Sequence, residues 1–209
     1  MTTEVRIYVE GGGDTADGKA RVRRGFHEFM HELVGIARQK RIRWNVIACG
    51  GRTQAFDSFI SAERDHAEAF NVLLVDSEGP LQAASPREHL KTRDGWALAL
   101  AKDCQIHLMV EAVEAWVMAA PEGLKSYYGQ GFNENPISSR RNLEEEPKDG
   151  LEPSLKAATK GTKKGEYHKI RHCPDLLERT DPSKVRSRCP HCRDLFNALC
   201  DELGAPHLP

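Results

Sequence analysis

The sequence has no long hydrophobic run. Its longest apolar stretches, such as Val-Leu-Leu-Val at residues 72–75, fall far short of the roughly 20 residues that a bilayer-spanning helix needs. Residues 1–4 do not form a basic region followed by an apolar stretch, so no signal peptide is expected. With 39% hydrophobic and 29% charged residues, the composition is that of an ordinary globular chain. We therefore expect a cytoplasmic location.

Two common catalytic motifs are also missing. The sequence contains neither the G-x-S-x-G turn of lipase-like hydrolases nor a Walker A phosphate loop. Any ATP hydrolysis linked to this protein would therefore come from another chain.

The sequence contains cysteines, but their spacing does not provide the two C-x-x-C pairs that are common in structural zinc sites. Without an export signal, the six cysteines are expected to be reduced thiols. Cys189-Pro-His-Cys192 has the spacing of half a zinc site, but structural zinc takes four ligands. No second C-x-x-C follows, and His172, Cys173 and Cys200 are the other candidate ligands. We interpret the pair as thiols at the start of a helix; the alternative is a zinc-stabilised nucleic-acid module.

The charge is almost balanced overall but unevenly distributed. The net charge is −1, yet residues 154–193 contain eleven Lys/Arg against four Asp/Glu, so this segment carries +7 and the remainder −8. A basic segment of this kind permits contact with a polyanion, whereas the alternative is an ordinary solvated surface.

The apolar pattern predicts a parallel α/β fold. Strands are expected at residues 5–9, 44–48, 71–75 and 106–110, and helices at residues 20–39, 53–66, 112–119 and 191–203. Thr53 is expected to cap the second helix. Strands that alternate with helices favour crossover connections and a parallel sheet.

The predicted architecture is a Rossmannoid sheet of about four strands flanked by helices, with a helical C-terminal extension. We place the α/β core at residues 1–120 and the basic, helical extension, packed on this core, at residues 121–209. Residues 133–153 are acidic, with Glu144-Glu145-Glu146, and contain three prolines, so a loop is expected there.

Acidic residues follow three of the predicted strands. Glu10, Asp76 and Glu111 stand at strand ends, Glu78 shares a turn with Asp76, and Asp14 follows a glycine turn. The carboxyl ends of parallel strands meet at one edge of a sheet. Clustered carboxylates repel one another, and hard oxygen ligands suit Mg²⁺ or Mn²⁺. The sequence thus predicts a metal site for one or two ions; the alternative is a set of ordinary turn and helix-start acids.

Basic residues are suitably placed for phosphate. The turn Cys49-Gly-Gly-Arg52-Thr53 precedes a predicted helix, whose N-terminus and arginine could hold an anion. The alternative is a tight turn with a solvated arginine. Lys91 and Arg93 follow the Asp76 strand and could approach the same edge.

A second basic segment, residues 160–169, is interrupted by glycines. Here Lys163 and Lys164 are candidates for stabilising developing negative charge, and Lys169 for binding phosphate. The alternative is again a solvated charged surface.

Several motifs together resemble a known group. They are Val-Glu-Gly-Gly-Gly-Asp (9–14), Cys-Gly-Gly-Arg-Thr (49–53), Val-Asp-Ser-Glu-Gly-Pro (75–80), His-Leu-Met-Val-Glu-Ala-Val-Glu-Ala-Trp (107–116) and Lys-Lys-Gly-Glu-Tyr-His-Lys (163–169). The first and third resemble the Glu-Gly and Asp-x-Asp turns of Toprim domains. The chain is most similar to a bacterial family of unknown function in the Toprim-like group, related to RloB and the overcoming-lysogenisation-defect nucleases.

The resemblance implies a Toprim-like fold and a metal role for Glu10, Asp76 and Glu78. It also implies a second metal held by Asp14 and Glu111, with Glu114 behind them. One departure is that Glu78 stands where the motif has a second aspartate, which shifts the position of that carboxylate.

The function that follows is a divalent-metal-dependent phosphodiesterase or nuclease acting on DNA or RNA. Glu10, Asp76 and Glu78 would act with Lys163 and Lys164, and the resemblance implies a role in phage or mobile-element defence beside a separate ATPase. The alternative is a non-catalytic partner that binds a nucleotide, nucleic acid or protein. Both readings allow a second copy of the chain as partner and neither involves a membrane.

Overall fold

Four parallel strands form a single sheet in the computed structural model, which describes residues 2–209. The strands are β1 (Glu4–Val9), β2 (Arg43–Ala48), β3 (Phe70–Asp76) and β4 (Ile106–Met109). Every strand end lies within one residue of its predicted position. The order is β2-β1-β3-β4, so β1 and β3 are neighbours at the centre of the sheet. The residues that follow these two strands therefore emerge side by side.

Helices connect and cover the strands. They are α1 (Ala16–Phe29), α2 (His31–Gln39), α3 (Arg52–Asp65), α4 (Pro86–Asp94), α5 (Val113–Ala119), α6 (Pro121–Tyr128), α7 (Lys148–Thr159), α8 (Lys169–Leu177), α9 (Pro182–Arg188) and α10 (Pro190–Glu202), with short 3₁₀ helices at Asp103–Gln105 and Leu143–Glu145. Between residues 2 and 209, no helix combines the length and apolar character needed to cross a membrane.

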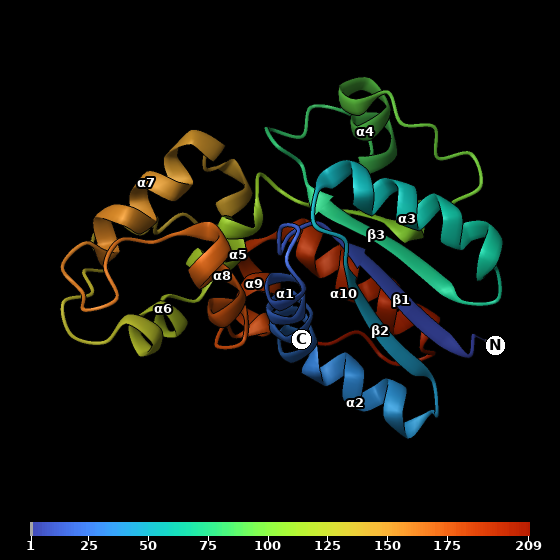
Figure 1. The fold of residues 1–209 in the computed structure, drawn as a ribbon, viewed down its shortest axis with the longest axis horizontal. Helices are drawn as coiled ribbons and strands as arrows, with labels where there is room; N and C mark the ends of the chain where they lie inside the picture. Colours follow the sequence, from blue (N-terminus) through green and yellow to red (C-terminus); the bar gives the residue numbers. More distant parts are fainter. Residues whose placement is uncertain (1) are drawn as a thin grey trace.

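Helices cover both faces of the sheet (Figure 1), and a hydrophobic core lies on each face. On one face, Leu73 and Val75 pack with residues of α3 and α4. On the other face, Val72 and Leu74 belong to a larger core with α1, α2, α10 and the remaining C-terminal helices. Burial of both faces explains why the β3 sequence is continuously apolar.

The C-terminal segment shares the larger core rather than forming a separate one. Leu155, Leu176 and Phe196 are buried together with residues of the sheet. In Figure 1, α6, α7 and α8 stand beyond the carboxyl ends of the strands, while α10 returns beneath the sheet. The extension therefore faces the sheet edge at which the acidic residues were predicted.

Part of the basic charge in this segment stabilises the fold. Arg186 is buried and binds Glu32 at 3.1 Å and the carbonyl oxygen of Pro209 at 2.7 Å. Arg188 donates to the carbonyl oxygens of Ala119 and Ser138. Arg186 and Arg188 therefore form contacts within the protein and are not part of a basic surface that could bind a polyanion.

Three local predictions were wrong. The predicted helix 20–39 is interrupted at Met30, because α1 packs on α8 while α2 packs on α10. Thr53 does not cap α3; the helix begins one residue earlier, with Gly51 at the cap. Residues 148–153 are the first half of α7 rather than loop, because Leu151 and Leu155 are buried in the core and override the Gly and Pro signals.

Gly25 is needed where α1 crosses α8. A Cβ atom at this position would lie 2.6 Å from the carbonyl oxygen of Pro174. We expect Gly25→Ala to lower the free energy of unfolding by about 1–3 kcal/mol, because the helices must separate. Gly35→Ala in α2, where the added atom meets nothing within 4 Å, should instead be neutral or stabilising by up to about 1 kcal/mol. Urea unfolding of both variants checks this, and equal effects would contradict it.

Candidate functional site

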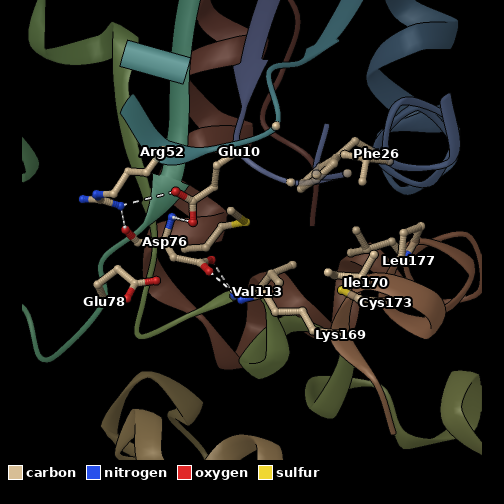
Figure 2. Close-up of a pocket in the computed structure, with 17 residues that line it drawn as sticks. Glu10, Phe26, Arg52, Asp76, Glu78, Val113, Lys169, Ile170, Cys173 and Leu177 are labelled. Atoms are coloured by element: carbon tan, nitrogen blue, oxygen red, sulfur yellow. Dashed lines mark hydrogen bonds and ion pairs between the residues drawn. The ribbon is translucent and has the colours of Figure 1, made fainter. Parts of the chain in front are cut away.

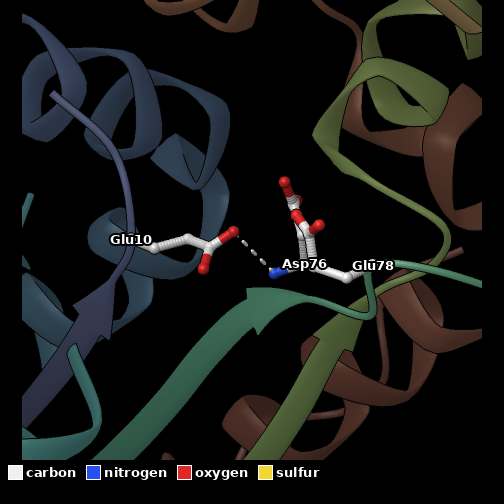
Figure 3. Close-up of side chains that lie close together, drawn as sticks. All are labelled: Glu10, Asp76 and Glu78. Carbon is white, nitrogen blue, oxygen red and sulfur yellow. Dashed lines mark hydrogen bonds between the residues drawn. The ribbon is translucent and has the colours of Figure 1, made fainter. Parts of the chain in front are cut away.

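Three carboxylates converge at the carboxyl ends of the two central strands. Glu10 follows β1, Asp76 ends β3, and Glu78 lies in the turn beyond it (Figure 3). One oxygen of each side chain lies within 4.8 Å of the others. The convergence predicted for these three residues is thus present, because β1 and β3 are adjacent and parallel.

The turn after β3 is held in an unusual conformation. The amide N–H groups of Ser77 and Glu78 donate to the carbonyl oxygens of Met109 and Glu111, each at 3.0 Å. Glu78 has φ 62°, in the left-handed region that side chains other than glycine seldom adopt. These hydrogen bonds continue the β3–β4 pairing past the strands and fix the position of the Glu78 carboxylate.

Asp76 is buried and has partners on both oxygens. Its Oδ1 accepts a hydrogen bond from the Val113 amide at 2.8 Å, at the start of α5. Its Oδ2 lies 2.8 Å from Nζ of Lys169, at the start of α8. The start of α5 and the ammonium group of Lys169 thus hold both oxygens of Asp76 in place.

Glu10 is less completely satisfied. Its Oε1 accepts from the Asp76 amide at 3.2 Å, whereas Oε2 is buried and accepts no hydrogen bond, with Nη1 of Arg52 at 3.5 Å. Burial, followed by the charge of Asp76, raises the pKa of Glu10 to about 8. An unpartnered oxygen beside other carboxylates is the arrangement that a divalent cation would stabilise.

Arg52 is oriented by a residue that the sequence analysis missed. Its Nε and Nη2 bind the two oxygens of Asp94 at 3.0 and 2.8 Å, and its guanidinium lies 5.0 Å from the ring centroid of Trp96. Nη1 donates to the carbonyl oxygen of Asp76. Arg52 therefore connects α3 and α4 with the end of β3 and places its charge beside Glu10. Its guanidinium is bound by protein groups, unlike the solvated arginine of the alternative interpretation.

Close pairing of two turns explains the glycines before α1 and α3. Gly11 and Gly50 exchange backbone hydrogen bonds of 2.7 and 3.1 Å. A Cβ atom at Gly50 would lie 2.8 Å from the carbonyl oxygen of Gly13, and one at Gly12 would lie 2.8 Å from the Lys19 backbone. The turns form one wall of the site.

Lysines from the C-terminal helices neutralise the outer carboxylates. Nζ of Lys148, at the first position of α7, contacts Glu78, and Arg93 lies 3.9 Å from the same carboxylate. Burial alone would raise the pKa of Glu78, but the Lys148 hydrogen bond and the charges of Lys148, Lys169 and Arg93 outweigh it and lower the pKa. Of these residues, Lys148 gave no signal in the sequence, because it lay within a predicted loop.

Glu114 lies behind the cluster. It is buried, its Oε2 is 3.1 Å from Lys169, and its Oε1 accepts a hydrogen bond from the Tyr167 hydroxyl at 3.1 Å. Burial raises its pKa and the charge of Asp76 adds to the rise, although Lys169 opposes the shift. Two carboxylates thus share one ammonium group and hold Lys169 in place.

A pocket of about 390 Å³ opens in front of these groups. The carboxylates, Arg52 and Lys169 line one end (Figure 2), and the glycine turns also line the pocket. The other end is apolar and is lined by Val22, Phe26, Ile170, Cys173, Pro174 and Leu177. The site is therefore a cavity between the sheet edge and the α1–α8 pair.

Other predicted ligands lie outside the three-carboxylate cluster. Asp14 is exposed and does not line the pocket. Glu111 is buried, and its Oε2 accepts from the Lys148 amide at 2.8 Å, which satisfies the N-terminus of α7. The carboxylate of Glu111 therefore stabilises the start of α7.

The lysines predicted for catalysis, Lys163 and Lys164, and for phosphate binding, Lys91 and Lys169, are dispersed. Of the four, Lys169 alone lines the pocket. Lys91 and Lys163 are exposed elsewhere, and Nζ of Lys164 lies 4.4 Å from the Tyr127 ring centroid. The part of the segment 160–169 that reaches the site is thus its last residue.

The Cys189–Cys192 pair lies in the hydrophobic core. Both thiols are free and fully buried, and His191 binds Glu144 at 2.7 Å. Within residues 2–209, neither cysteine belongs to a group of three or more metal-ligating side chains.

Lys148 competes with a cation for Glu78. We expect Lys148→Met to tighten Mg²⁺ binding severalfold, because the carboxylate loses its ammonium partner. Lys156→Met on the same helix, where the lysine pairs with Glu152 at 2.9 Å, should leave it unchanged. Calorimetric titration with Mg²⁺ checks both variants; unchanged or weaker binding to Lys148→Met would contradict the prediction.

Comparison with known proteins identifies a family but no characterised relative. Neither the curated proteins nor the solved structures give a match. Residues 9–200, which include the whole candidate site, match the family described as Domain of unknown function (DUF4276). The chain belongs to this family.

Proposed function

We propose that the protein is a divalent-metal-dependent phosphodiesterase, a nuclease acting on DNA or RNA, and that its fold is Toprim-like. The observation that carries the proposal is the convergence of Glu10, Asp76 and Glu78 at the ends of adjacent parallel strands. The Toprim-like relationship is supported by the same feature, a Glu-Gly turn after β1 and an Asp-x-Glu turn after β3.

The side chains suit a hard cation. All three candidate ligands are carboxylates, and Oε2 of Glu10 is buried without a hydrogen bond. Mg²⁺ or Mn²⁺ bound here would supply charge stabilisation to a phosphoryl group and lower the pKa of a coordinated water.

Basic side chains around the carboxylates complete the proposed site. Lys169 is held by Asp76 and Glu114 and borders the pocket, so it replaces Lys163 and Lys164 as the residue proposed to steady a phosphate. Arg52 holds Glu10 in place and adds positive charge. We give Asp14 and Glu111 no part in holding this cation, since they lie outside the cluster.

One observation favours a second function. Asp76 and Glu78 already have ammonium partners, Lys169 and Lys148. A carboxylate cluster neutralised in this way could serve a non-catalytic subunit that binds a nucleotide, nucleic acid or protein. The proposed partners are the same in both cases: nucleic acid, a second copy of the chain and a separate ATPase, in phage or mobile-element defence.

A cleavage assay tests the proposal. Purified protein is incubated with linear, supercoiled and single-stranded DNA and with RNA, in Mg²⁺, Mn²⁺ or EDTA. We expect cleavage in the presence of either metal and none in EDTA. Absence of cleavage on all substrates, both alone and with co-purifying proteins, would favour the non-catalytic function.

A further inference from the structure

The pocket has two chemically different ends. At one end are the three carboxylates, Arg52 and Lys169; at the other is an apolar wall formed by Val22 and Phe26 of α1 and by Ile170, Cys173, Pro174 and Leu177 of α8. Figure 2 shows the two groups facing each other across the cavity. Phosphate and metal chemistry accounts for the first end only.

Helix α8 supplies both a charged group and the apolar side chains of the wall. Ile170, Cys173 and Leu177 recur at spacings of three and four, so they lie on one face of α8. Lys169, one residue earlier, points to Asp76. A ligand that contacts Lys169 would therefore have the apolar face beside it.

Ile170 is unusually exposed for a residue lining a pocket. Its relative accessibility is 60%, and Leu100, at 64%, is the other large hydrophobic side chain exposed among residues 2–209. Leu100 lies away from this pocket. Ile170 thus offers apolar surface at the pocket and has no packing role that requires it.

The wall is rigidly attached. Arg21 binds Asp175 at 3.0 Å and Arg24 binds Glu178 at 2.6 Å, which joins α1 to α8 on the outer side. Gly25 allows the two helices to approach closely. A wall held in this way is formed before a ligand arrives.

We propose that this wall binds the base of a nucleotide whose phosphate lies at the carboxylate end together with a divalent cation. The inference rests on the proposed function, because the phosphate is placed at the same site. A divalent cation held by Glu10, Asp76 and Glu78 would add the positive charge that draws the phosphate to this end of the pocket. Among residues 2–209, the amide N–H groups of Gly12 and Gly13 have no acceptor, and both glycines line the pocket.

The dimensions favour an unpaired base. A volume of about 390 Å³ is near the lower end of the range of about 300–1,000 Å³ for small-molecule sites, so the pocket accommodates a single nucleotide. A base within a duplex must leave its stack to enter such a pocket. The ligand is therefore a free nucleotide or an unpaired nucleotide of a single strand.

The test measures binding without cleavage. Deoxyadenosine monophosphate has no phosphodiester bond, so its calorimetric binding in Mg²⁺ does not depend on catalysis. We expect deoxyribose 5-phosphate, which lacks the base, to bind about tenfold more weakly or worse. Ile170→Ser should weaken binding of the nucleotide by a similar factor without affecting the sugar phosphate, and the matched variant Leu100→Ser should change neither.

The outcomes separate this inference from the proposed function. Equal binding of the two ligands, no binding of the nucleotide, or equal effects of the two serine variants would overturn the base site, even if the protein cleaves nucleic acid. Base-dependent binding without any cleavage would support the base site and refute the nuclease. Competition by a single-stranded oligonucleotide, but not by a duplex, would identify a strand as the source; no competition would identify a free nucleotide.

Discussion

Replacing Asp76 by Asn together with Glu78 by Gln should abolish metal-dependent cleavage, with a loss on the order of 10³-fold or more. The amides keep the shape of the side chains but remove two of the three negative charges that would hold the cation. The amide oxygen introduced at position 76 could still accept the hydrogen bond that Asp76 receives from Val113, so the start of α5 should be preserved.

The double variant should also remain folded. The charge of Asp76 contributes to the raised pKa of Glu10, so its removal relieves repulsion in the metal-free protein. Cleavage rates in Mg²⁺ and thermal unfolding in EDTA measure the two effects separately. The matched control is Asp57→Asn with Glu88→Gln, which removes two exposed charges from α3 and α4 outside the pocket. Equal activity of the two double variants would exclude the carboxylate cluster as the catalytic site.

The central acidic site could be predicted because its geometry follows from strand order and direction. Alternation at residues 5–9 and the apolar run before Asp76 locate two strands, and parallel strands end at one edge. Glu10 and Asp76 were therefore predictable as neighbours once β1 and β3 were adjacent. Glu78 was predicted because it shares a turn with Asp76, but its left-handed backbone is indicated by no propensity.

The positions of the basic side chains in the site could not be predicted in the same way. Lys148 reaches Glu78 across 70 residues of sequence, and it does so because α7 begins where Glu111 accepts its amide. Arg52 was predicted, but its partner Asp94 ends a helix 42 residues later. Such contacts depend on how the C-terminal helices and α4 pack, which short-range patterns do not specify.

In the basic segment, the local pattern predicted more site residues than the structure brings to the pocket. A count of Lys and Arg cannot distinguish Lys169, which lines the pocket, from Lys163, which is exposed away from it. Nor does it reveal that Arg186 is buried against Glu32. Net segment charge therefore indicated a part of the chain that reaches the pocket, but it did not separate Lys169 from the lysines that lie outside the pocket.

The metal-free protein should lose stability as the pH rises from about 5 to about 8, and Glu10→Gln should remove much of this loss. Glu10 has a folded-state pKa of about 8, against an ordinary value of 4.5. In that interval the folded state binds more protons than the unfolded state, so raising the pH favours unfolding. Below about 4.5 the carboxyl is protonated in both states and the effect vanishes. Between pH 5 and pH 8, we expect the free energy of unfolding to fall by roughly 2–4 kcal/mol more in the wild type than in Glu10→Gln, since each unit of pKa corresponds to about 1.4 kcal/mol.

Urea unfolding in EDTA at pH 5, 6, 7 and 8 measures this dependence. His191 also has a raised pKa, chiefly through its hydrogen bond with Glu144, and its contribution to stability falls as the pH rises above the ordinary histidine value of 6.5. The quantity to compare is therefore the difference between wild type and Glu10→Gln, in which the His191 contribution cancels. Addition of Mg²⁺ should stabilise the wild type more at pH 8 than at pH 5, because the cation binds the charged carboxylate, and should stabilise Glu10→Gln less. Parallel pH profiles for the two proteins in EDTA would show that Glu10 is ionised at little cost, and the main physical argument for a cation beside it would then fail.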